Sequence, residues 1–280
     1  MNHAGDTSGL LKDAEALKAY IKRTLYGDME FVDQLEDELE KGARAAGVLL
    51  PLGFWKGTYG DICFILNKRS RRVRQAGDLC CPGGSVEGIR DRFISWLLIT
   101  LGRPYSVRDF WKLVKGSRAD SSSRILTLLG AALRESWEEM RLSPFGIELL
   151  GGLSPQRLRR SDRVIQPFLV WVRKQDQFVP NWEVEKIVKI PLRELLCEEN
   201  YARFRIYMDY RFQREPGQYV EDVPCFLHQD GTEVDVLWGA TLRIISRFLE
   251  RFFNFQIPDM SNRPIVPAVL DKSYWLGMNG

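Results

Sequence analysis

The spacing of apolar residues along the chain separates helical segments from extended ones. Over residues 1–44, apolar side chains recur every three or four positions, which predicts amphipathic helices interrupted near Gly27. Apolar runs bounded by turn residues predict strands at 45–52, 61–67, 147–153 and 164–173. A further amphipathic stripe predicts a helix at 241–252. This mixture of strands and helices indicates an α/β fold.

Another helix is predicted to end near residue 142, because Pro144 stops it. Its apolar face is formed by Ile125, Leu129, Ala132, Leu133 and Met140. Glu135, Glu138 and Glu139 are spaced by three and four positions, so they crowd into an arc of about 100° that borders this face.

The three glutamates repel one another, and those near the helix C-terminus also oppose its dipole. Such a cluster indicates a compensating cation, and carboxylate oxygens suit Mg²⁺ or Mn²⁺. A simpler interpretation stays open. Arg134 and Arg141 could neutralise the glutamates as ordinary surface ion pairs, which are weak.

A glycine pair upstream favours the metal site over the surface ion pairs. The sequence Pro82-Gly83-Gly84 precedes the helix, and Arg134-Glu135 is followed by Glu138-Glu139. Together these residues resemble the box of the Nudix hydrolases, G-x5-E-x7-R-E-U-x-E-E-x-G-U, where U is a bulky apolar residue. Two positions depart from that pattern: Ser136 stands at an apolar position and Arg141 at the second glycine.

The resemblance implies a loop–helix–loop that holds a divalent metal against a diphosphate. Carried over to this chain, the expected metal ligands are Glu135, Glu138 and Glu139. Glu135, Glu138 and Arg134 are the expected catalytic residues, with Arg134 holding a box glutamate in place. One box glutamate, or a loop carboxylate not yet identified, would be the general base.

The first half of the box matches less closely. Its first glutamate has no direct counterpart; Asp91 is the nearest acidic residue and Glu87 a weaker candidate. Gly83 and Gly84 are expected to let the backbone turn sharply beside the substrate phosphates.

A basic segment before the glycine pair resembles one branch of this family in particular. Residues 65–70, Arg74 and Gly77 are similar to the motif L-L-T-x-R-S-x3-R-x3-G-x3-F-P-G-G of Nudix enzymes that act on coenzyme A. Asn67 and Cys81 depart from it, and the spacing from Arg74 to Gly77 is one residue short. The resemblance implies that Arg69 and Arg74 bind substrate together with Gly83 and Gly84; by composition alone, the segment is a solvated loop.

An insertion at 92–123 interrupts the box. It is rich in aromatic side chains and carries six basic residues against two acidic ones. Residues 116–123 are expected to form a loop by composition. We expect the insertion to be either a lid that contacts an anionic ligand or an arm that packs against a second copy of the chain.

Composition limits the remaining possibilities. The 280 residues carry a net charge of +3, which is too small to indicate nucleic acid by itself. No apolar signal segment opens the chain, and the longest apolar run, 93–101, is too short to cross a bilayer. The five cysteines show no C-x-x-C spacing, which favours reduced thiols. We therefore expect a cytoplasmic protein with no membrane or nucleic-acid partner.

These expectations combine into one hypothesis. The resemblance implies a Nudix-type α/β/α sandwich around a mixed β-sheet, with an N-terminal helical extension at 1–44, the Nudix domain at 45–252 and a C-terminal tail at 253–280. It implies a Mg²⁺- or Mn²⁺-dependent pyrophosphatase for a small nucleoside diphosphate derivative, coenzyme A or a related compound, in a chain that could form a homodimer. Two alternatives remain: a binding module without turnover, and a hydrolase of ADP-ribose or nucleotide sugars.

Overall fold

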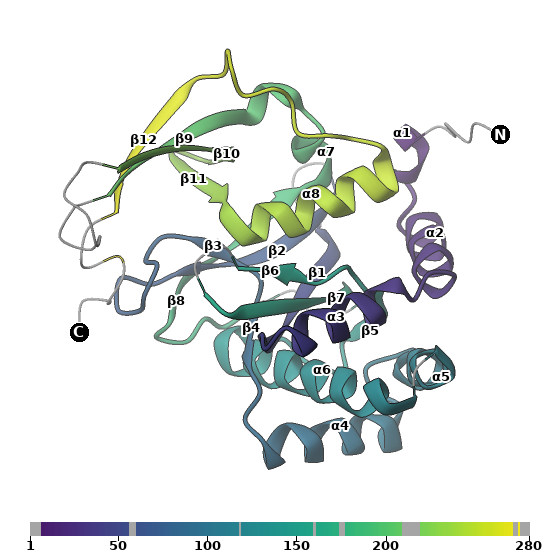
Figure 1. Cartoon of the computed structure of the whole chain (residues 1–280). Coiled ribbons are helices and arrows are strands. Elements are labelled where there is room, and N and C mark those ends of the chain that lie inside the picture. The colour runs from purple at the N-terminus through teal and green to yellow at the C-terminus, as the bar shows by residue number, and fades with distance from the viewer. Residues whose placement is uncertain are drawn as a thin grey trace. The chain divides into compact units, whose positions relative to one another are not determined.

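The computed structural model describes residues 7–55, 60–117, 119–158, 161–173, 177–208, 219–270 and 274 (Figure 1). Packing divides the chain into two units. The first contains residues 1–65 and 81–179, and the second contains residues 66–80 and 180–280.

A mixed sheet forms the centre of the first unit. Its strands are β1 (Arg44–Trp55), the first part of β2 (Asp61–Arg69), β4 (Gly83–Ser85), β5 (Ile147–Gly152), β6 (Gln156–Arg157) and β7 (Arg163–Val172). β1 runs parallel to β7 and antiparallel to β2 and β4. All residues of β1 from 46 to 53 are buried, as expected for a strand in the middle of a sheet covered on both faces.

Two of the N-terminal helices, α2 (Ala14–Tyr26) and α3 (Glu30–Glu40), lie against this sheet. The short helix α1 (Thr7–Leu10) packs against α2. Asp13 caps α2 by accepting hydrogen bonds from two backbone N–H groups, and Gly27 ends it. Leu25 and Phe31 press on Gly151 and Gly152 of β5, where any side chain would collide with them. The predicted N-terminal helical extension is confirmed.

The segment predicted as an insertion, residues 92–123, is largely helical. It falls within α4 (Ile89–Leu101), α5 (Val107–Ser117) and the start of α6 (Ala119–Met140). The loop predicted at 116–123 is therefore wrong, although residue 118 lies outside the described residues. The serines and the aspartate that suggested a loop occupy the first turn of α6, a position where such residues are also favoured.

Helix α6, which carries the glutamates of the box and is called the box helix below, packs on β1 so closely that the two backbones are in contact. A Cβ atom at Gly47 of β1 would lie 2.0 Å from the carbonyl oxygen of Leu128 on α6. This contact fixes the height of α6 above the sheet and therefore the position of the glutamates near its end.

The second unit has its own sheet, in the order β11-β10-β9-β12. Its elements are β3 (Leu79–Cys80), the end of β2, β8 (Val184–Pro191), α7 (Leu192–Leu195), η1 (Glu198–Asn200), β9 (Tyr201–Met208), β10 (Tyr219–Asp230), β11 (Glu233–Trp238), α8 (Gly239–Phe253) and β12 (Ile265–Leu270). The segment predicted as a tail thus contains a strand, because β12 pairs in parallel with β9. The predicted helix at 241–252 is confirmed as α8.

The structure confirms the mixed α/β class, with helices packed on mixed sheets. Within the described part of the chain, no helix is long and apolar enough to span a bilayer.

Candidate metal and phosphate site

The two halves of the box meet where β4 passes the C-terminal part of α6. Gly83 and Gly84 of β4 pair with Val48 and Gly47 of β1, while α6 covers the same strand. The fold therefore brings the glycine pair and the glutamates together although α4 and α5 separate them in the sequence.

Both glycines lie in close contact with neighbouring atoms. Gly83 has φ 145°, and a Cβ there would lie 2.4 Å from the carbonyl oxygen of Gly47. A side chain at Gly84 would collide with a residue of the site itself, because a Cβ would lie 2.6 Å from Oε1 of Glu135. The sequence predicted glycines for a sharp turn; in the structure, Gly84 also makes room for a box glutamate.

Two of the glutamates face this strand. The backbone N–H of Gly83 donates to Oε2 of Glu139 at 3.2 Å, and the Glu139 side chain is buried. Glu135 lies against Gly84. The third, Glu138, has a side chain that is 50% exposed, so it is open to water or a ligand.

Arg134 links the acidic residues. Its Nε donates to Oδ1 of Asp91 at 2.8 Å, and Nη1 donates to Glu135 at 3.1 Å and to Glu138 at 3.3 Å. Although burial by itself lowers the pKa of Arg134, these carboxylates raise it, so the guanidinium stays charged. The role expected for Arg134, holding a box glutamate in place, agrees with these contacts.

Asp91 is the less expected partner of this arginine. Its side chain is fully buried, and Oδ2 also accepts the backbone N–H of Glu87 at 2.5 Å. Glu87 itself is half exposed, with its carboxylate 3.6 Å from Arg134. Of the two candidates for the missing box glutamate, Asp91 is therefore committed to Arg134, and Glu87 is open to solvent.

The electrostatics of Glu135 favour a nearby cation. Burial raises the pKa of Glu135; Arg134 opposes this effect, and the neighbouring charges of Glu138 and Glu87 add to it. A cation beside the carboxylate would stabilise its ionised form.

The helix end explains the departure at the box glycine. Arg141 has φ 57°, the left-handed conformation that a glycine adopts at this point. The N–H group of Arg141 donates to the carbonyl of Trp137, as in the αL type of helix cap, and the N–H group of Leu142 donates to the carbonyl of Ser136. Arginine thus keeps the turn of the box glycine at a cost of about 1–2 kcal/mol.

Ser136, the other departure, is fully buried. Its hydroxyl donates to the carbonyl oxygen of Ala132 at 2.6 Å, so the polar group is satisfied within the helix.

The donor set fits a hard divalent cation in its chemistry. Among the residues that the structure describes, no group of three acidic, histidine or cysteine side chains converges on one point. Mg²⁺ commonly binds through one or two carboxylates and completes its shell with water and substrate phosphates. Glu135 and Glu139, which both contact the glycine strand from α6, are the pair best placed for this mode.

The other two predicted binding residues, Arg69 and Arg74, belong to the second unit. The Arg69 Nε donates to the carbonyl oxygen of Arg74 at 2.7 Å, and the backbone of Arg69 bonds to Asp78 and Gly77. Arg69 therefore closes the loop between β2 and β3.

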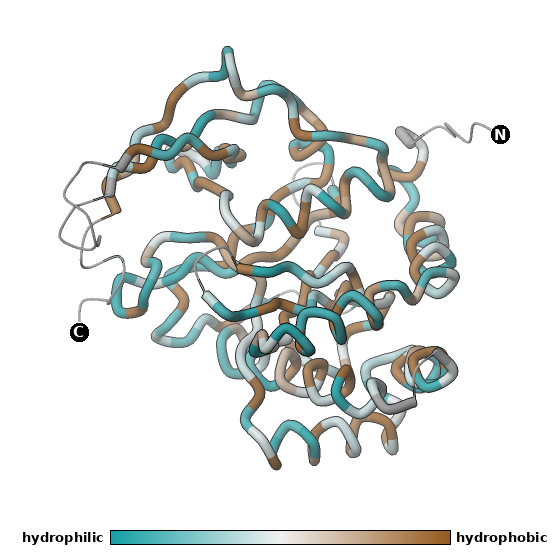
Figure 2. The backbone as a smooth tube through the Cα atoms, viewed as in Figure 1, coloured by the Kyte–Doolittle hydropathy of each residue, from teal (hydrophilic) through white to brown (hydrophobic). Residues whose placement is uncertain are grey.

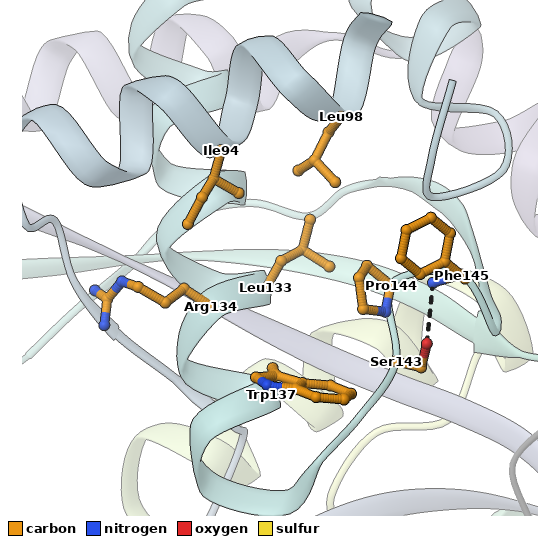
Figure 3. Close-up of a pocket in the computed structure, with 8 residues that line it drawn as sticks. All are labelled: Ile94, Leu98, Leu133, Arg134, Trp137, Ser143, Pro144 and Phe145. Carbon is orange, nitrogen blue, oxygen red and sulfur yellow. Dashed lines mark hydrogen bonds between the residues drawn. The ribbon is translucent and has the colours of Figure 1, made fainter. Parts of the chain in front are cut away.

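A pocket beside the box helix was not predicted. It has a volume of about 310 Å³ and lies between α4, α6 and residues 143–145 (Figure 3). Its lining is largely apolar: Ile94, Leu98, Leu133, Arg134, Trp137, Ser143, Pro144 and Phe145. Only the apolar spacing of α4 could have indicated it, and that spacing does not show which face of the helix is buried.

Comparison with known proteins gives a fold-level likeness. No family model matches the chain, and no curated protein matches it. A MutT/nudix family protein from Enterococcus faecalis is 14% identical, covering 76% of this chain and 62% of that one, with a TM-score of 0.41. A NUDIX hydrolase from Nitrosomonas europaea is 13% identical, covering 82% and 80%, with a TM-score of 0.40.

The C. elegans Ap4A hydrolase, in a binary complex, is 14% identical over 55% of this chain and 83% of its own, with a TM-score of 0.35. At such TM-scores the likeness does not identify the family, so the functional assignment rests on the site.

Proposed function

We propose that the chain is a Nudix-type hydrolase that cleaves the pyrophosphate bond of a nucleoside diphosphate derivative, with coenzyme A or a related compound as substrate. The observation that carries the proposal is the packing of Glu135 and Glu139 against the Gly83-Gly84 strand, with Arg134 bound to Glu135 and Glu138. The coenzyme A assignment rests on the motif that contains Arg69 and Arg74.

The residues of the site would share the work of binding the metal, orienting its ligands and transferring a proton. Glu135, Glu138 and Glu139 would hold Mg²⁺ or Mn²⁺, directly or through water. When bound, the metal supplies charge neutralisation on the diphosphate oxygens and a lowered pKa for the attacking water. Arg134 keeps Glu135 and Glu138 oriented, and Gly83 and Gly84 leave the backbone free of side chains there.

Proton transfer needs a carboxylate with a pKa close to the working pH. Burial raises the pKa of Glu135 in that direction, which supports Glu135 as the proton acceptor among the box glutamates. Glu138 is more exposed and is better suited to hold the metal through water.

The direct test is product analysis of the purified chain with coenzyme A, ADP-ribose and a nucleotide sugar at equal concentration, with Mg²⁺ or Mn²⁺. Glu135→Gln and Glu138→Gln are expected to lower kcat/KM by at least a hundredfold. Glu40→Gln, the same change at an exposed position of α3, is the matched control and should leave it unchanged. The preferred substrate would separate a coenzyme A enzyme from an ADP-ribose or nucleotide-sugar hydrolase.

Arg141 in place of the box glycine and the long interruption of the box support a second candidate, a module that binds the ligand without turnover. Calorimetry with the same compounds distinguishes the two. Binding without any product, unchanged in Glu135→Gln, would favour the module and contradict the enzyme.

Arg69 and Arg74 stay predictions that rest on the motif. Replacing Arg74 by Gln should raise KM for coenzyme A more than it lowers kcat, because a phosphate contact mainly contributes binding. The cytoplasmic location and the homodimer also stay predictions.

A further inference from the structure

Helix α4 buries two polar residues, Asp91 and Ser95, and exposes most of its large apolar side chains. Asp91, Ser95 and Leu98 are its buried residues. Its large apolar side chains are exposed to the following extents: Ile89 86%, Phe93 60%, Trp96 59%, Leu97 37% and Leu101 51%. Figure 2 shows hydrophobic positions recurring along this helix. The orientation is the reverse of that in an ordinary surface helix.

The reversal is fixed by contacts with α6. Gly130 of α6 has no room for a side chain, because a Cβ would lie 2.6 Å from both the carbonyl oxygen of Asp91 and the hydroxyl of Ser95. That hydroxyl lies 2.7 Å from the carbonyl oxygen of Leu126. Asp91 is held by Arg134. The polar face of α4 is therefore locked inward, and its apolar face cannot rotate into the core.

The exposed residues form one continuous stripe. At about 100° per residue, Ile89, Phe93 and Trp96 fall within an arc of roughly 60°, and Leu97 and Leu101 extend it toward the pocket. The rings of Phe93 and Trp96 lie 6.0 Å apart. In the lining of the pocket, Trp137 and Phe145 are 44% and 59% exposed. An apolar area of this extent marks an interaction surface.

The charges beside the stripe indicate what kind of partner it binds. Arg92 and Arg90 are both exposed and lie on opposite sides of the arc formed by Ile89, Phe93 and Trp96. Arg90 lies between Leu97 and Leu101, with its Nη1 3.5 Å from Oε2 of the exposed Glu87. The single acidic residue of α4, Asp91, is buried and paired. The neighbouring helix α5 exposes Arg108, Lys112 and Lys115 against Asp109. Aromatic and aliphatic side chains flanked by arginines are typical of helices that lie in the interface of an anionic bilayer.

We propose that α4 is a docking surface for an anionic lipid bilayer. The helix, about 20 Å long, lies in the plane of the interface. Ile89, Phe93 and Trp96 enter the boundary of the acyl chains, and Arg90 and Arg92 contact lipid phosphates. This inference does not depend on the proposed function, because none of these side chains belongs to the box.

The test is flotation of the full chain with vesicles of phosphatidylcholine alone, or with 30% phosphatidylglycerol, at low and high salt. We expect binding to the anionic vesicles, at least fivefold weaker binding to the neutral ones, and weakening by salt. Phe93→Ser/Trp96→Ser should lower the partition coefficient at least tenfold. Trp182→Ser, which removes an equally exposed tryptophan (58%) in the second unit, is the matched control and should bind like the parent.

Circular dichroism melting of each variant checks folding, and Ile89→Ser gives a second variant at the most exposed position. Absence of vesicle binding by the folded parent, equal binding to both vesicle compositions, or full binding by the folded double variant would overturn the proposal. Sedimentation velocity tests the alternative partner, a second copy of the chain. A dimer that the double variant disrupts, without vesicle binding, would instead make the stripe an interface between two copies of the chain.

Discussion

Asp91 and Arg134 form a buried ion pair between α4 and the box helix. The Arg134 Nε donates to the Asp91 carboxylate at 2.8 Å, with side chains 8% and 0% exposed. The pair connects α4 to the arginine that orients Glu135 and Glu138. A change in α4 can therefore affect the candidate site without contacting it.

Asp91→Asn should reduce both stability and activity. Asparagine keeps the shape but leaves the buried guanidinium without its main counter-charge, at a cost of about 3 kcal/mol. Urea denaturation measures this cost, and kcat should fall because Arg134 is no longer fixed. Glu87→Gln is the control, since Glu87 is half exposed and should change stability by less than about 0.5 kcal/mol. Equal effects of the two substitutions would contradict the assigned role of Asp91.

Gly84→Ala should weaken metal binding more than it weakens the fold. The added methyl group meets the carboxylate end of Glu135, which can swing away at little cost in stability. Mn²⁺ affinity, measured by calorimetry, should fall about tenfold. Gly116→Ala is the matched change in open space and should leave that affinity unchanged. Unaltered Mn²⁺ binding by the Gly84 variant would argue against Glu135 as a ligand.

Substitutions at Arg141 test the left-handed helix end. Arg141→Ala and Arg141→Gly both remove the guanidinium that stacks over Trp137 at 5.3 Å. Only glycine also relieves the conformational cost, so the glycine variant should be the more stable of the two by about 1 kcal/mol. Thermal melting of the two proteins measures the difference. An alanine variant as stable as the glycine variant would show that φ 57° carries no strain here.

Asp78 in the second unit should make stability depend on pH. Burial raises the pKa of Asp78 to about 6, although Tyr274 and Trp238 donate hydrogen bonds to it. Between about pH 4 and pH 6 the folded state thus holds a proton that the unfolded chain has released. The free energy of unfolding should fall as pH rises through this window and level off above it.

Asp78→Asn removes this contribution. Denaturation of parent and variant at pH 4 and pH 7 should show the parent losing stability relative to the variant on going to the higher pH. The same difference between the two proteins at both values would place the pKa of Asp78 near its ordinary value.

The sequence predicted the regular elements well where one face is buried. Strands β1, β2, β5 and β7 were located to within about three residues, because their apolar runs are continuous. The end of the box helix was located by Pro144. The partnership of Glu135 with Gly84 was not predicted, since it depends on how closely β4 and α6 approach each other.

The insertion could not be interpreted from periodicity. An apolar stripe normally indicates the buried face, but in α4 Asp91 and Ser95 are buried by partners on α6 that are more than thirty residues away in the sequence. The strand β12 was missed for a different reason. Its six residues are apolar, but Pro267 lies among them, and a proline argues against a strand except at the edge of a sheet, where β12 lies.

The crossing of α4 over Gly130 has a consequence for how the site is assembled. The loop of residues 85–133 must close to bring the glycine strand to Arg134. In the uninterrupted box, the corresponding loop has thirteen residues. For an unstructured chain, the longer closure costs about 1 kcal/mol more in conformational entropy. The contacts of Asp91 and Ser95 with α6 oppose that penalty. The segment therefore contributes to its own closure from its inner face, and substitutions on its outer face are expected to leave the geometry of the glutamates unchanged.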